Sequence, residues 1–235
     1  MTFPTRLTAR TLAGAAALAL ASGAGAQDRN GTNADAADAG TPGEVAQLAM
    51  AQDLYAYGVE AEDALAVLSA ARITDAISTE EADREAARTE VEGVDVTDEG
   101  RGAEAPVDAA TMYATAAQLA GDDEPLQALI AEAQEDRARG RIGGPSRTLS
   151  HLPGGQMDGF RIPFYGGILA EIAVIGDGDT NLDAVIEDEN GNVICIDQSW
   201  SDKLYCSFTP IWDGPFHVSV ANMGGYRNSY YLITN

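Results

Sequence analysis

The chain has 235 residues, 45% of them hydrophobic, and a formal net charge of −23 from 37 acidic against 14 basic residues. A chain of this length can bury a substantial core in one or two domains. The acidic balance argues against nucleic acid and anionic membranes as partners, and high solubility is its simplest consequence.

The first 26 residues have the pattern of a Sec-type signal peptide. Arg6 and Arg10 precede an apolar run at 12–21 and a small-x-small cleavage site at 24–26, so we expect Gln27 to begin the mature protein. No later stretch approaches the roughly 20 apolar residues of a spanning helix, so no membrane span is expected. The predicted location is the periplasm or the medium outside a bacterial cell.

Helices are predicted next along the chain. Residues 27–43 lack bulky apolar side chains and are predicted to form a disordered tether. Residues 44–142 are predicted to be α-helical, because apolar side chains recur there at spacings of three and four. The first such stripe consists of Val45, Leu48, Gln52, Tyr55 and Val59, and Gly58 is a plausible end for that helix.

Two parts of this region have alternative interpretations. Residues 78–102 are strongly polar, which fits a solvated helix followed by a loop. Asp63 to Ala70 resembles Glu124 to Ala131, which indicates either a short helical-repeat array or a coincidence of alanine-rich composition. Acids and a proline at 122–125 begin another helix, and the glycines and proline at 140–145 end it. Residues 143–156 are then predicted to be a linker.

From residue 157 to the end, apolar and polar side chains alternate in short runs separated by turn residues. Asn190-Gly191 is a strong hairpin signal. The predicted strands are 160–164, 168–175, 182–187, 192–197, 203–209, 216–221 and 229–234. The expected fold class is α+β in two parts, with a helical N-terminal region followed by an antiparallel β-sandwich at 157–235.

The two cysteines are expected to form a disulfide, because exported proteins fold in an oxidising compartment. If Gln198 faces Lys203 in a hairpin, the same register places Cys195 opposite Cys206. Facing residues in an antiparallel pair are close enough for a disulfide.

Several segments of the last part resemble bacterial pre-peptidase C-terminal domains. They are Gly159 to Phe164, Asp179 to Cys195, Cys206 to Pro210, Gly214 to Asn222 and Asn228 to Asn235. The resemblance covers about residues 155–235 and is one of strands and turns, with no catalytic signature.

The resemblance implies a jelly-roll-like β-sandwich of secreted proteins, often found beside a peptidase, that assists secretion or binds extracellular material, in some members with calcium. Two features depart from the family. Its usual Asp-Leu-Asp-Leu appears here as Asn181-Leu182-Asp183-Ala184, and no peptidase domain is recognisable in the helical region.

The acidic loop at 177–183 is the candidate metal site. Asp177, Asp179, Asn181 and Asp183 alternate along it and offer the oxygen ligands that Ca²⁺ takes. The alternative is a solvated turn that leads into a strand.

Trp200 is expected at the tip of a disulfide-closed hairpin, where it is a candidate contact for a partner protein or a polysaccharide. Packing against Trp212 or Tyr205 is the alternative.

No enzyme is predicted. The only histidines are His151 and His217, zinc-protease and nucleophile-elbow motifs are absent, and Ser150 beside His151 does not make a triad. We expect an exported, non-catalytic binding or stabilising module with an unknown extracytoplasmic protein or polysaccharide as partner. The alternatives are a helical adaptor, in which residues 44–142 bind a partner protein, and a cryptic hydrolase.

Overall fold

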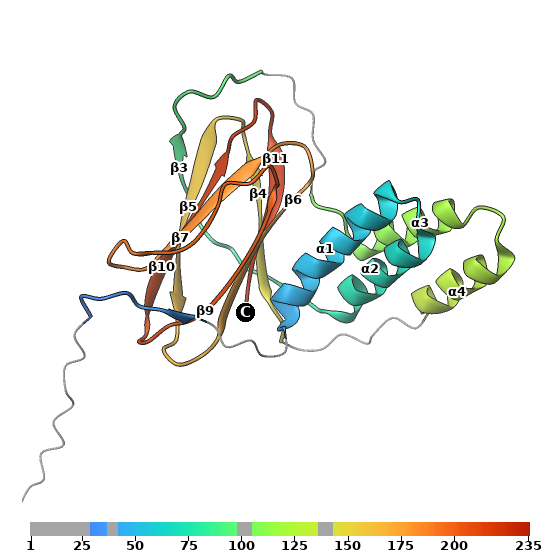
Figure 1. The fold of residues 1–235 in the computed structure, drawn as a ribbon, viewed down its shortest axis with the longest axis horizontal. Helices are drawn as coiled ribbons and strands as arrows, with labels where there is room; N and C mark the ends of the chain where they lie inside the picture. The colour runs from blue at the N-terminus through green and yellow to red at the C-terminus, as the bar shows by residue number, and fades with distance from the viewer. Residues whose placement is uncertain (1–28, 37–41, 98–104, 136–142) are drawn as a thin grey trace, which may run out of the picture.

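The computed structural model describes residues 29–36, 42–97, 105–135 and 143–235. The predicted signal peptide and cleavage site, and Arg137, Arg139 and Arg141 at the end of the last predicted helix, lie outside these residues. Figure 1 shows a β-sandwich on one side and a group of helices on the other, with α1 between them.

Four helices form the helical part, as the sequence predicts. They are α1 (Glu44–Glu60), α2 (Ala64–Ala76), α3 (Ala109–Ala120) and α4 (Glu124–Glu135). Asp63 accepts hydrogen bonds from the amides of Leu65 and Ala66, and Asp108 accepts one from Thr111. These side chains cap α2 and α3 at their first turns, where backbone amides lack helical partners.

Small residues allow the helices to pack closely. The helical core is formed by α2, α3 and Ile130 of α4, with Val67, Met112, Tyr113 and Ala116 at its centre. Gly58 does not end the first helix, contrary to the prediction. A Cβ at Gly58 would lie 2.7 Å from the Val67 side chain, so this glycine allows α1 to approach α2.

Two antiparallel-rich sheets form the sandwich. One has the strand order β1-β9-β6-β11-β4-β2 and the other β3-β5-β10-β7-β8. The bounds are β4 (Ser146–Leu152), β5 (Gln156–Phe164), β6 (Ala170–Gly176), β7 (Leu182–Glu187), β8 (Val193–Asp197), β9 (Lys203–Thr209), β10 (Gly214–Asn222) and β11 (Asn228–Thr234).

The pairing of these eight strands is that of a jelly roll. β4 pairs with β11, β5 with β10, β6 with β9 and β7 with β8, all antiparallel. One long folded hairpin is thus rolled into two facing sheets. Phe164, Phe208 and Phe216 pack edge-on or tilted in the space between the sheets. The predicted fold class is confirmed.

Three short strands come from the region before residue 91, where none was predicted. They are β1 (Asp35–Ala36), β2 (Glu80–Glu81) and β3 (Ala87–Glu90), which extend the sheets at β9, β4 and β5. The prediction of a solvated helix after residue 78 is therefore wrong. The prediction of a linker at 143–156 is also wrong, because this range contains β4. The partners of β1, β2 and β3 lie far away in the sequence, so the spacing of apolar residues does not reveal these strands.

Within the range predicted to be a disordered tether, Asn33 is fully buried. Its Oδ1 accepts from the amides of Ile211 and Trp212, and its Nδ2 donates to the Trp212 carbonyl at 3.1 Å. Its own amide donates to Asp188 Oδ2 at 2.8 Å. For residues 29–36 the tether prediction is wrong, because local composition does not show these distant partners.

Asp188 receives further bonds from Asn190 and Asn192 at the β7–β8 turn. Burial alone would raise the pKa of Asp188, but the hydrogen bonds from Asn192, Asn33 and Asn190 outweigh it and lower the pKa. The predicted hairpin between β7 and β8 is confirmed, but its turn is centred on Glu189 and Asn190, with the Gly191 amide donating to the Asp188 carbonyl at 3.1 Å. Of Asn190 and Gly191, only Gly191 has positive φ, at 80°.

Asp158 is a buried carboxylate that links four strands. On β5 it points into the sandwich with no exposed surface. Arg88 of β3 binds both its oxygens, at 2.7 and 3.1 Å. Ser150 of β4 and Tyr230 of β11 donate to its Oδ2. Because β4 and β11 belong to the opposite sheet, Asp158 joins the two sheets through polar contacts.

The helices contact the sandwich through α1. Val45 and Leu48 pack on Ala173, Ile175 and Ile233, which face outward from β6 and β11. Every residue of β6 is buried, because one face lies inside the sandwich and α1 covers the other. This arrangement explains why the strand reads as a nearly continuous apolar run.

Replacing Asn33 with alanine should lower the free energy of unfolding by about 2–3 kcal/mol, because the buried amide of Trp212 and the partly buried amide of Ile211 would lose their acceptor. Urea denaturation measures the change. Thr32→Ala is the matched control, since Thr32 is exposed, and it should stay within about 0.5 kcal/mol of wild type. Equal stability of the two variants would contradict the role assigned to Asn33.

Replacing Arg88 with glutamine should destabilise the protein by about 2–4 kcal/mol, because the buried Asp158 would lose its bidentate cation. Removing both charges, in Arg88→Gln with Asp158→Asn, should cost less than Arg88→Gln alone. Arg161→Gln is the control, because Arg161 is exposed on the same strand as Asp158. If Arg88→Gln unfolds at the same urea concentration as Arg161→Gln, the ion pair does not stabilise the fold.

Candidate functional site

The candidate site lies where the loop before β7 meets the loop between β8 and β9. The predicted disulfide between Cys195 and Cys206 is present, with its Cα atoms 6.2 Å apart. The predicted hairpin is wrong, because Cys195 lies opposite Ile186 in one sheet and Cys206 opposite Ile172 in the other. The disulfide therefore links the two sheets, and residues 198–202 cross from one to the other.

Trp200 lies in this crossing segment and is 98% exposed. The alternative in which it folds over Trp212 or Tyr205 does not occur. Trp212 is buried elsewhere and donates from its indole nitrogen to Glu189 Oε1. An indole that stays in water contributes none of the favourable free energy that a large apolar side chain normally gains when it is buried on folding. Trp200 is therefore available for contact.

The backbone that carries Trp200 is held on its C-terminal side. The carbonyl of Ser201 accepts from the Leu182 amide at 3.0 Å, and that of Asp202 accepts from Gly176 at 2.8 Å. Asp202 Oδ2 also accepts from the Gly178 amide at 2.6 Å. The loop with Trp200 and the acidic loop thus form one hydrogen-bonded surface.

Several carboxylate oxygens of the acidic loop already accept hydrogen bonds from the protein. Asp177 accepts from the amides of Ser229 at 2.8 Å and Asp179 at 3.2 Å, one on each oxygen. Asp183 accepts from the Asn181 side chain at 3.0 Å. Across the described residues, no three Asp, Glu, His or Cys side chains come together as a metal cluster. The predicted ligands do not form a preassembled carboxylate site.

Two observations at the loop nevertheless fit a cation. Burial raises the pKa of Asp177, against the hydrogen bonds from Ser229 and Asp179, so its charge is poorly solvated. Asn181 Oδ1 and Asn228 Oδ1 are buried and receive no hydrogen bond from a described residue. Asn228 Nδ2 donates to the Thr180 carbonyl, so both amides belong to this corner. Amide oxygens are ligands that calcium accepts.

The residues considered for hydrolysis do not converge. Ser150 points inward and donates to Asp158, while the adjacent His151 lies on the other face of β4 and contacts Ser229 Oγ at 3.0 Å. Neighbouring residues of a strand point to opposite faces, so adjacency prevents a Ser–His pair here. His217 is exposed on β10, as the alternation predicts.

A second location was not predicted from the sequence. A cavity lies between α1 and the outer face of the six-stranded sheet and contains Arg147 and Tyr231. Arg147 belongs to β4, the segment mistaken for a linker. The alternation of Thr148, Ser150 and Leu152, now seen as the buried face of that strand, was the available signal.

Comparisons with known proteins find solved structures that are similar to part of the chain. No protein-family model matches the chain, and no curated protein matches it. Among solved structures, the pre-peptidase C-terminal domain of collagenase from Bacillus anthracis is 19% identical, with a TM-score of 0.34. The match covers 40% of this chain and 92% of that one. The chain is similar to a pre-peptidase C-terminal domain. The resemblance given by the sequence is confirmed.

Two further matches are parts of larger glycoside hydrolases. A Clostridium thermocellum xylanase with CBM22-1 and GH10 modules, complexed with xylohexaose, is 12% identical over 38% of this chain, with a TM-score of 0.25. The exo-β-1,3-galactanase of Phanerochaete chrysosporium with galactose is 12% identical over 43%, with a TM-score of 0.22. The chain spans 24% and 30% of their lengths.

Proposed function

We propose that this protein is an exported, non-catalytic binding module that contacts an extracytoplasmic protein or polysaccharide through Trp200. The observation that carries the proposal is the 98% exposure of Trp200 on an anchored loop. An exposed indole offers a large apolar face together with an N–H donor, and such residues dominate the binding energy of many interfaces.

The position of Trp200 favours binding for a physical reason. The disulfide lies close to the loop in sequence, and three hydrogen bonds hold Ser201 and Asp202 on its C-terminal side. A contact residue on an anchored backbone loses little conformational freedom when a partner binds. This lower entropic cost increases the affinity available from one aromatic side chain.

Export is part of the proposal. The predicted signal peptide supports it, and the disulfide fits an oxidising compartment such as the periplasm or the extracellular medium. In the described residues, no helix has the length and apolarity needed to cross a membrane.

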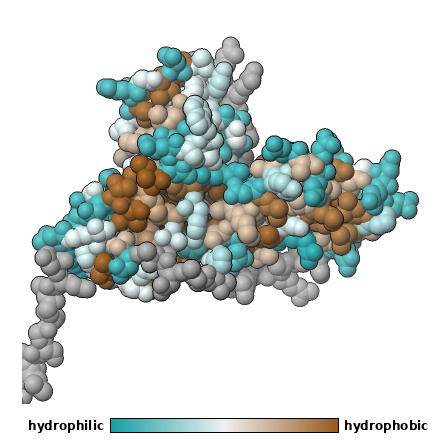
Figure 2. Space-filling model, in the orientation of Figure 1, coloured by the Kyte–Doolittle hydropathy of each residue, from teal (hydrophilic) through white to brown (hydrophobic). Residues whose placement is uncertain are grey.

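A helical adaptor is the second candidate, and exposed apolar side chains on the helices support it. Met50 and Tyr57 of α1, Leu65 of α2 and Leu129 of α4 are each at least 40% exposed. Figure 2 shows hydrophobic surface on both the helical part and the sandwich, separated by hydrophilic residues. In this alternative, residues 44–142 bind the partner protein and the sandwich stabilises the chain.

Pull-down from envelope extract and culture fluid, together with sedimentation on insoluble polysaccharides, tests the two candidates. The whole mature chain is the bait, because a cut at residue 143 would separate β2 and β3 from the sandwich. Trp200→Ala should reduce the recovery of the bound partner at least tenfold. Tyr57→Ala, at an exposed position of α1, should leave it unchanged.

The reverse pattern would support the helical adaptor and overturn the role of Trp200. Both variants should unfold at the same temperature as wild type, because both side chains are exposed. This control separates lost contact from lost structure.

We propose calcium binding by Asp177, Asp179, Asn181 and Asp183 as a separate property of the acidic loop. The buried amide oxygens of Asn181 and Asn228, which have no donor among the described residues, and the poorly solvated Asp177 support it. A cation would offset the cost of burying the Asp177 charge. Binding should weaken as the pH falls and Asp177 becomes protonated, because ligand carboxylates must be ionised.

Thermal denaturation in millimolar Ca²⁺ or excess chelator tests this property. Calcium should raise the melting temperature of wild type, because a ligand that binds only the native state stabilises it. The shift should disappear in Asp179→Asn and persist in Asp213→Asn, a change to an exposed acid outside the acidic loop. Equal melting temperatures of wild type with and without calcium would exclude the site.

A further inference from the structure

The cavity between α1 and the sandwich has a volume of about 190 Å³. Drug-sized ligands occupy about 300–1,000 Å³, whereas an apolar cavity of about 150 Å³ holds benzene. The volume therefore fits a molecule with one ring or a short branched chain.

Its walls are mostly apolar and come from both parts of the protein. Helix α1, the end of α2, the start of α3 and the chain next to them supply one side, and strands β4, β6 and β11 supply the other. The apolar lining residues are Leu48, Ile77, Val107, Ile175 and Ile233. Such walls favour a ligand with an apolar body.

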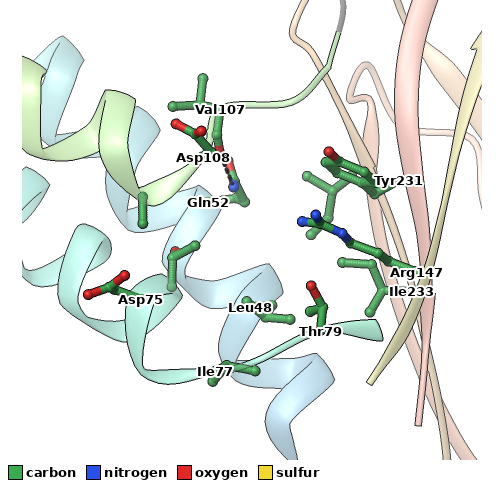
Figure 3. Close-up of a pocket in the computed structure, with 13 residues that line it drawn as sticks. Leu48, Gln52, Asp75, Ile77, Thr79, Val107, Asp108, Arg147, Tyr231 and Ile233 are labelled. Carbon is green, nitrogen blue, oxygen red and sulfur yellow. Dashed lines mark hydrogen bonds between the residues drawn. The ribbon is translucent and has the colours of Figure 1, made fainter. Parts of the chain in front are cut away.

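Arg147 provides the cationic group of the cavity. Its Nε donates to Glu81 Oε1 at 2.6 Å, and its guanidinium carbon lies 4.7 Å from the centre of the Tyr231 ring. These two contacts fix the plane of the guanidinium. Its two terminal nitrogens make no hydrogen bond to any described residue. Figure 3 shows them pointing into the space between the sheet and Gln52.

The polar groups opposite Arg147 are already engaged. Gln52 Nε2 donates to the Val107 carbonyl at 2.9 Å, and Asp108 Oδ1 accepts from the Thr111 amide at 2.8 Å. No ion pair within 4 Å joins Arg147 to Asp108 among the described residues, but the two are close enough that the charge of Arg147, after the hydrogen bonds from Thr111, helps to lower the pKa of Asp108. A guanidinium with free parallel N–H groups on an apolar wall matches the two oxygens of a carboxylate.

We propose that this cavity binds a small monocarboxylate with an apolar body, held by the terminal nitrogens of Arg147. Asp75 and Asp108 at the lining disfavour a second negative charge, so a monoanion fits better than a dianion. The net charge of −23 does not prevent binding, because salt at physiological strength screens charges beyond about 8 Å.

The ligand would contact α1 and the sandwich together. The apolar contact of Val45 and Leu48 with the sheet borders the cavity, and Leu48 belongs to both. A bound carboxylate would therefore stabilise the attachment of the helices to the sandwich. This property is independent of Trp200 and of the acidic loop.

Three ligands with the same apolar body test the proposal by calorimetry on the full mature chain. They are phenylacetate, 2-phenylethylamine and 2-phenylethanol. Phenylacetate should bind at least tenfold more tightly than either analogue. If the amine binds as tightly or more tightly, Asp75 and Asp108 define a cation site and the proposal is wrong. The proposal is also wrong if phenylacetate gives no detectable binding heat at about 10 mM, a concentration tenfold above a dissociation constant of about 1 mM.

Matched variants assign the contact. Arg147→Gln should weaken phenylacetate binding at least tenfold. Glu81→Gln also removes the ion pair of Arg147 but keeps its terminal nitrogens, so binding should persist. Arg161→Gln controls for the change in net charge. Loss of binding in Glu81→Gln to the same extent as in Arg147→Gln would mean that the ion pair, and not a carboxylate contact, maintains the cavity.

Discussion

The buried carboxylate of Asp158 is the constraint on which the sandwich depends. It receives hydrogen bonds from Arg88, Ser150 and Tyr230 and thereby connects both sheets and the added strand β3. The disulfide joins the sheets at the opposite edge, between β8 and β9. One edge is thus joined by a polar network and the other by a covalent bond, while the phenylalanines fill the space between them.

This arrangement anchors both ends of the segment that crosses between the sheets at the disulfide edge. The sheets fix where residues 198–202 begin and end, so Trp200 can remain exposed at little structural cost. The helices are attached at another face, through Val45 and Leu48 of α1. Helix α1 also reaches the acidic loop, where Asp53 pairs with Lys203 at 3.5 Å and Gln52 lines both the Arg147 cavity and a pocket beside Asp177.

Local patterns predicted much of the fold. Alternation identified the strands from 160 onward, and turn chemistry identified Asn190-Gly191. The pairing of Cys195 with Cys206 was predicted correctly for the wrong reason, because a hairpin and a crossing between sheets place the same two residues near each other. Asn33, Arg88 and Arg147 could not be predicted, since each depends on a partner distant in the sequence or on a face that exists only after packing.

Strands β1, β2 and β3 also constrain the order in which the chain can fold. Each is synthesised before its partner, and β1 pairs with β9 across more than 160 residues. The backbone amide and side chain of Asn33 cannot form their hydrogen bonds until residues 188–212 have been synthesised. Contacts of such long range slow folding, because the intervening chain must close into a loop first. The N-terminal segment therefore cannot pair with β9 until nearly the whole chain has emerged, an order that is compatible with the export proposed above.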